Sequence, residues 1–152
     1  MRNLVIEKQN AQTYGQFLIK LELRNKLSRL RNKLIKKLDA ISTEMEEDRV
    51  DIVKSLSAKD EDGEPIIVKL DGQESYDVKD TKKLNDELKE LREERVAIEV
   101  GEYSSNFSPL FEYLDSEEFT LPLSGQDAIV YDTLLDAWEN AVNGEDNKEE
   151  EK

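Results

Sequence analysis

Two residue types that dominate catalysis and metal binding are absent, because the 152 residues of this chain include neither cysteine nor histidine. Without cysteine there is no disulfide framework and no thiolate for catalysis or metal binding. Without histidine, the commonest general base and metal ligand is also missing. These absences favour a protein that is not an enzyme, and the sequence predicts no catalytic residues, no metal site and no cofactor.

Apolar side chains are scarce as well. Hydrophobic residues make up 37% of the chain and aromatic residues 7%, whereas charged residues make up 38%. This balance favours long amphipathic helices with exposed charged faces over a sandwich or barrel. No window approaches the ~18 apolar residues that a membrane span requires, and the N-terminus lacks the long apolar region of a signal peptide. We therefore expect a soluble intracellular protein that does not bind membranes.

Charge is distributed unevenly along the chain, whose formal net charge is −14. Residues 1–38 carry ten Lys/Arg against two Asp/Glu, which leaves a net charge of +8. Residues 39–152 carry twelve against thirty-four, which leaves −22. An acidic protein repels nucleic acid at long range. Direct binding to nucleic acid is therefore not expected.

One apolar stripe predicts a long helix. Its members recur about every 3.67 residues, the period of a nearly straight helix. They are Leu23, Leu27, Leu30, Leu34, Leu38, Ile41, Met45, Ile52 and Leu56, and the period counts Arg49 at the one position of the stripe that is not apolar. An earlier helical pattern begins near Asn10, and periodicity alone leaves open whether the two helices are continuous. A second copy of the chain is one way to bury this stripe, so a homo-oligomer is an open alternative.

The helical pattern stops at a segment rich in turn-forming residues, which includes Pro65 and two Asp-Gly pairs. Residues 66–70 and 74–78 flank this region's second turn and predict a β-hairpin with a three-residue loop, 71–73. Helical periodicity resumes over residues 81–95. We expect this shorter helix to return antiparallel to the long one.

The C-terminal part combines one strand with helices. Apolar residues alternate over 96–100, and this strand is expected to pair with residues 4–7 in a small sheet. A short helix follows Ser105. In the last helix Ser124 is the predicted N-cap, and Asp127 is expected to complete a capping box. The apolar residues of this last helix are Ile129, Leu134, Leu135, Trp138 and Val142.

These segments predict one α-dominated α+β domain over residues 1–142. It contains a long helix with a shorter antiparallel partner, a β-hairpin insertion, a small two-stranded sheet, and C-terminal helices folded back onto the basic half. Residues 143–152 are polar and acidic, and we expect them to be a disordered tail.

Three blocks carry a resemblance to a known family: "LSRLRNKLIKKL" (27–38), "ELKELREERVAIEVGEY" (87–103) and "LSGQDAIVYDTLLDA" (123–137). In these blocks the chain resembles a DUF1617-like family of small uncharacterised proteins encoded by phages and prophages of Gram-positive bacteria. The resemblance implies a viral origin and action in the host cytoplasm or within the virion. Family members often carry glycine near Asn25, a residue that tolerates the left-handed conformation, so a helix break there is one option. None of the blocks is a catalytic signature.

The stretch 24–37 contains seven basic residues and no acidic ones, and we call these seven side chains the cationic face. They are Arg24, Lys26, Arg29, Arg31, Lys33, Lys36 and Lys37. The favoured interpretation is internal neutralisation by carboxylates of the C-terminal helices. The alternative is an interaction face for phosphates, an anionic membrane or an acidic partner.

The acidic stretches are predicted to be turns and solvated helix faces. Gly63 falls fourth after Asp60, whereas the glycine of a calcium-binding EF-hand loop stands sixth, so residues 60–64 predict a turn. The leading hypothesis is a non-enzymatic phage protein that contacts a phage morphogenesis protein or a host protein, in virion assembly or host takeover. The alternative is an acidic inhibitor or nucleic-acid mimic directed at a host defence enzyme.

Overall fold

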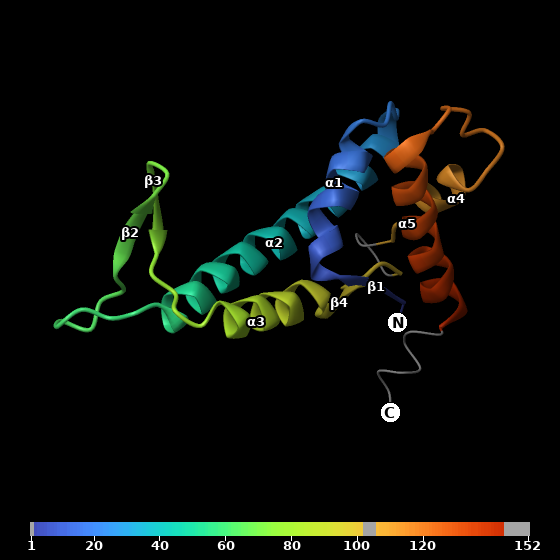
Figure 1. Ribbon diagram of the computed structural model, residues 1–152. Coiled ribbons are helices and arrows are strands. Elements are labelled where there is room, and N and C mark those ends of the chain that lie inside the picture. The colour runs from blue at the N-terminus through green and yellow to red at the C-terminus, as the bar shows by residue number, and fades with distance from the viewer. Residues whose placement is uncertain (1, 102–105, 145–152) are drawn as a thin grey trace. The chain divides into compact units, whose positions relative to one another are not determined.

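The computed structural model describes residues 2–101 and 106–144. They divide into unit 1, which comprises Met1–Ser42 and Arg95–Lys152, and unit 2, which is Thr43–Glu94. The predicted fold class is confirmed, since the described chain is α+β and mainly α (Figure 1).

The two predicted limits of the domain stay predictions. The acidic tail predicted over 143–152 lies outside the described residues from position 145 onward. Of the first two residues of this predicted tail, Asn143 is the last residue of a helix, and Gly144 is the C-cap of that helix in the left-handed conformation. The division into units does not test the single domain predicted over 1–142.

The long helix is confirmed as α2 (Asn25–Leu56), which has 32 residues. It is preceded by β1 (Asn3–Glu7), a 3-10 turn η1 (Lys8–Asn10) and α1 (Ala11–Ile19). The two helices are not continuous, because Asn25 has a φ of 52°. Asparagine is among the few non-glycine residues that visit this left-handed conformation readily.

The predicted small sheet of unit 1 is also confirmed. β1 pairs antiparallel with β4 (Arg95–Glu99), and Leu4 stands opposite Ile98 in the register. Leu4 and Ile98 are both buried. The alternating apolar pattern therefore places one face of the sheet in the core.

The core of unit 1 draws on every helix of that unit. α2 contributes Leu34 and Leu38, while α4 (Ser108–Leu114) and α5 (Gly125–Asn143) supply much of the remainder. The rings of Phe111 and Trp138 are stacked, with centroids 4.5 Å apart and planes inclined by 6°. The C-terminal helices thus share one core with the N-terminal half of α2.

Two details predicted for α5 are wrong. Ile129 and Val142, predicted as part of its apolar stripe, are 59% and 42% exposed, and Val130 and Ala141 are buried instead. Neighbouring apolar positions on one helix compete for the core, and tertiary packing selects between them. The capping box is absent because Ser124 makes no side-chain cap, and the Asp127 carboxylate lies 3.1 Å from Lys20 Nζ.

Unit 2 contains the C-terminal half of α2, the hairpin of β2 (Ile67–Leu70) and β3 (Gln73–Tyr76), and α3 (Thr81–Glu93). The hairpin is confirmed, but its loop has two residues, because Leu70 pairs with Gln73. The intervening Asp71 and Gly72 have φ values of 51° and 82°, the combination required by a type I′ turn.

The helix α3 begins as predicted. Asp80 is its N-cap, and the Asp80 carboxylate accepts a hydrogen bond from Lys83 N at 3.0 Å. Within the described residues no helix is both long and apolar enough to cross a membrane.

Unit 2 has almost no core. Leu91 and Ser57 are its only buried residues, and the structure describes every residue of this unit. Its other apolar side chains are partly or largely exposed. Unit 2 therefore presents apolar surface that its own fold leaves open.

Candidate functional site

Most of the cationic face is solvent-exposed. Arg24, Lys26, Arg29, Lys33 and Lys36 are exposed, whereas the remaining two cations of the face are half-buried. The apolar stripe of α2 turns Leu30, Leu34 and Leu38 into the core, so the charged positions between these leucines point outward.

The expected neutralisation by C-terminal carboxylates is not found. Across residues 2–101 and 106–144, no carboxylate lies within 4.0 Å of a nitrogen of the seven cations. The ion pair that does reach α5 starts from Lys20, at the end of α1. The physical reason is that α5 packs through its apolar side chains, while Asp132, Asp136 and Glu139 on the same helix are exposed.

Arg31 differs from the other cations because its guanidinium is used within the fold. It donates hydrogen bonds to the carbonyl oxygen of Leu21, to Ser28 Oγ and to Asn32 Oδ1. Leu21 is buried and lies between α1 and α2. Arg31 therefore holds the connection between these helices, and we assign it a structural role.

Replacing Arg31 by methionine is expected to lower the free energy of unfolding by about 1–3 kcal/mol, because the Leu21 carbonyl loses a charged donor. Urea titration followed by circular dichroism measures this change. Lys33→Met is the matched control, since Lys33 is exposed and makes no hydrogen bond or ion pair with a described residue. Equal stability losses in the two variants would contradict the structural role.

Three cations of the face border a pocket of about 510 Å³, which we call the cationic pocket. The first turns of α2 form one side, and the residues at the start of α4 form the other. The lining residues are Asn25, Lys26, Arg29, Leu30, Lys33, Asn106 and Pro109. The pocket belongs to unit 1, and none of the described residues that line it is acidic.

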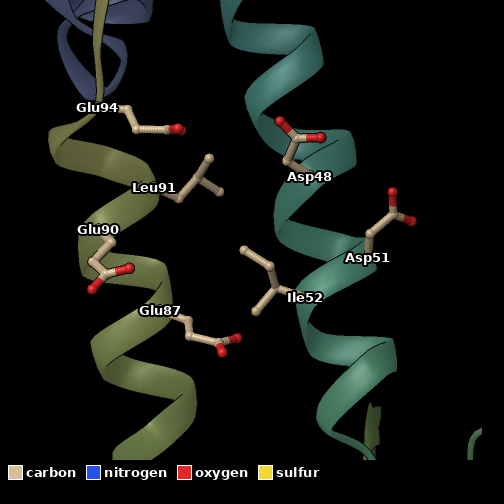
Figure 2. Close-up of a pocket in the computed structure, with 7 residues that line it drawn as sticks. All are labelled: Asp48, Asp51, Ile52, Glu87, Glu90, Leu91 and Glu94. Carbon is tan, nitrogen blue, oxygen red and sulfur yellow. The ribbon is translucent and has the colours of Figure 1, made fainter.

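Unit 2 carries a groove of opposite charge between α2 and α3, which we call the acidic groove (Figure 2). Its volume is about 480 Å³, and its lining consists of Asp48, Asp51, Ile52, Glu87, Glu90, Leu91 and Glu94. Figure 2 shows Ile52 and Leu91 facing the space between the two helices, with Asp51 and Glu90 set apart from each other. Carboxylates spread in this way suit an extended basic surface better than a single ion.

No metal site is found in the described part of the chain, where no group of three or more carboxylates converges on one point.

Residues 60–64 form a turn, as predicted. The carboxylate of Asp60 accepts hydrogen bonds from the backbone N–H groups of Asp62 and Glu64, both at 2.9 Å. Gly63 has a φ of 82° in this turn.

Unit 2 also carries an apolar groove, which sequence reasoning missed. It has a volume of about 610 Å³ and is enclosed by α2, the β2–β3 hairpin and α3. Its apolar lining consists of Val50, Val53, Ile67, Leu70, Tyr76, Val78 and Leu84, and its polar lining of Arg49, Glu74, Ser75 and Thr81. Ile67 and Leu70 are 55% and 65% exposed.

A signal for this groove was present in the sequence. Residues 66–70 read "IIVKL", so apolar side chains occupy both faces of the first strand. A two-stranded hairpin buries one face at most, and a polar second face is the rule. The apolar second face of this strand is therefore the feature of the sequence that corresponds to the groove.

The fold and its surfaces define a small, mainly helical protein with a cationic pocket in unit 1 and an acidic and an apolar groove in unit 2. The chain belongs to the family described as "Protein of unknown function (DUF1617)", whose model matches residues 2–145. The comparison with curated proteins and the comparison with solved structures each found no match. The family resemblance is thus confirmed, and the phage context stays a prediction.

Proposed function

We propose that this chain is a non-enzymatic phage protein that acts through protein–protein contacts, with the apolar groove of unit 2 as its docking surface. The partner is a phage morphogenesis protein or a host protein, met in the host cytoplasm or in the virion. The observation that carries the proposal is the exposure of Ile67 and Leu70 beside a groove whose lining is mostly apolar.

The energetics favour a covered groove. Burying an exposed leucine or isoleucine side chain contributes about 1.5–3 kcal/mol, so a partner that covers the two strand residues gains several kcal/mol. Monomeric proteins rarely keep contiguous apolar surface open unless it is used. The type I′ turn and the strand pairing of the hairpin hold these side chains in place, because Ile67 pairs with Tyr76 and Leu70 pairs with Gln73.

The net negative charge of unit 2 favours a partner with a basic surface. Unit 2 carries eighteen Asp/Glu against nine Lys/Arg, a net charge of −9 over its 52 residues. The acidic groove adds five carboxylates to its surface. A partner with apolar anchors surrounded by Lys and Arg would therefore be steered toward unit 2 and oriented on it.

The proposal is tested by capture from infected cells. Tagged protein is expected to retain one specific partner, and Leu70→Ser is expected to weaken that capture about tenfold, because one of the two most exposed apolar side chains of the groove is lost. Ile129→Ser is the matched control, since Ile129 has a similar exposure of 59% but lies on α5 in unit 1. Circular dichroism of each variant checks that the fold is retained.

Three outcomes would contradict this proposal. Capture that is equal for the wild type and Leu70→Ser would remove the apolar groove as the docking surface. Equal losses in Leu70→Ser and Ile129→Ser would indicate a general defect. Recovery of a second copy of the chain as the sole partner would replace it with a homo-oligomer.

The second candidate is an acidic inhibitor or nucleic-acid mimic directed at a host defence enzyme, and the acidic groove favours it. Duplex DNA carries one charge per ~1.7 Å of its axis. The five carboxylates of the groove share their surface with the lysines and arginines of unit 2, so they imitate part of that density. This candidate predicts that the captured protein is a nuclease or other DNA-directed enzyme, that DNA competes for it, and that affinity falls steeply with salt.

A further inference from the structure

We propose that the cationic pocket of unit 1 binds a small phosphate-bearing ligand of nucleotide size. Its volume of about 510 Å³ lies within the usual range for small-molecule sites, about 300–1,000 Å³. The proposal involves unit 1 residues alone and does not depend on the docking surface of unit 2.

The pocket offers donors suited to an anion. Lys26, Arg29 and Lys33 are spaced by three and four residues, so they lie on one side of α2. The guanidinium of Arg29 can bind a phosphate through two parallel hydrogen bonds, and the two ammonium groups supply point charges. Asn106 accepts from the backbone N–H of Ser108 through its Oδ1, at 3.2 Å, which leaves its amide NH₂ as a donor.

These cations stand where the helix itself disfavours them. The first turn of α2 contains no acidic residue, although the N-terminal end of a helix favours negative charge. Like charges three and four residues apart also repel each other. No described carboxylate relieves Lys26, Arg29 or Lys33. A bound anion would offset both costs at once.

The remaining lining argues for an organic ligand that carries phosphate. Pro109 adds apolar surface beside the cations, against which a base or sugar can pack, and the mostly buried Leu30 borders the same pocket. The net charge of −14 disfavours large polyanions such as nucleic acid at long range. A small ligand with few charges meets less of this repulsion, so a nucleotide fits better than a nucleic-acid strand.

The test is isothermal titration calorimetry of the full chain with ADP, inorganic phosphate and adenosine. We expect saturable heat with ADP and none with adenosine, because the phosphates are what the three cations recognise. Lys26→Gln/Arg29→Gln is expected to weaken ADP binding at least about tenfold. Arg24→Gln/Lys36→Gln removes the same charge from exposed positions outside the pocket and is expected to change affinity less than about twofold.

Each alternative outcome overturns the proposal. Equal weakening by the two double variants would indicate diffuse attraction to the cationic face. Absence of saturable heat with both ADP and inorganic phosphate would remove the phosphate site. Tighter binding of an acidic decapeptide than of ADP would assign the pocket to an acidic protein segment. Saturable heat with inorganic phosphate and none with ADP would also overturn the proposal, because the proposed ligand is of nucleotide size.

Discussion

Replacing Phe111 by alanine is expected to lower the free energy of unfolding by about 3–5 kcal/mol, the cost of emptying a fully buried aromatic site. Phe111 has no exposed surface and stacks on Trp138 at 4.5 Å. The ring pair adds about 0.5–1.5 kcal/mol beyond the buried area. Since domains of this kind are stable by about 5–15 kcal/mol, the variant loses a large share of its stability.

Urea titration measures this loss, and Trp138 reports it directly, because it is the only tryptophan of the chain. Glu112→Ala is the matched control, since the neighbouring residue on α4 is exposed. The control is expected to change stability by less than about 0.5 kcal/mol. A loss below about 1 kcal/mol for Phe111→Ala would contradict the position of this ring at the centre of the unit 1 core.

Unfolding is expected to become easier in alkali because of Tyr14. Burial of this side chain, with smaller contributions from the charges of Glu7 and Asp136, raises the pKa of Tyr14 from 10.0 to about 12. A pKa that is higher in the folded state favours the neutral phenol. Its contribution to stability is therefore complete below pH 10 and is lost as the pH rises toward 12. The loss is on the order of 1–3 kcal/mol.

The measurement is the urea midpoint between pH 9 and pH 12, compared between the wild type and Tyr14→Phe. The variant lacks the ionising group, so its stability is expected to fall less over this range. Burial also raises the pKa of Tyr131, and this effect is present in both proteins. The contribution of Tyr14 is therefore the difference between the stability losses of the wild type and of Tyr14→Phe. Parallel losses in the two proteins would show that the Tyr14 phenol is not buried in the folded state.

Local elements of this protein were predictable because their signals lie within a few neighbouring residues. The period of the leucines predicts α2, the helical periodicity of residues 81–95 predicts α3, and Asp71-Gly72 predicts the hairpin. The pairing of β1 with β4 was predictable too, since few other strands were present to pair. The length of the hairpin loop was not, because a one-residue difference depends on the register of the whole ladder.

The candidate sites were predicted less well. Residues 24–37 were recognisable as a basic segment, yet the favoured interpretation, pairing with carboxylates of the C-terminal helices, was wrong, because sequence alone does not decide between such pairing and exposure. Arg31 could not be separated from Lys33, although one caps a buried carbonyl and the other borders a pocket. The apolar groove left only the double-faced pattern of residues 66–70 as a clue.

By itself, the sequence determined the helical character of the chain, its family, the hairpin, and the opposite charges of its two ends, because composition and periodicity are properties of neighbouring residues. Tertiary structure alone decided which side of α5 is buried, that Asp127 forms an ion pair with Lys20, and which cations line one pocket. Those outcomes depend on distances between residues far apart in the chain, and a Coulomb or hydrogen-bonding interaction exists only when folding brings its partners within a few ångströms.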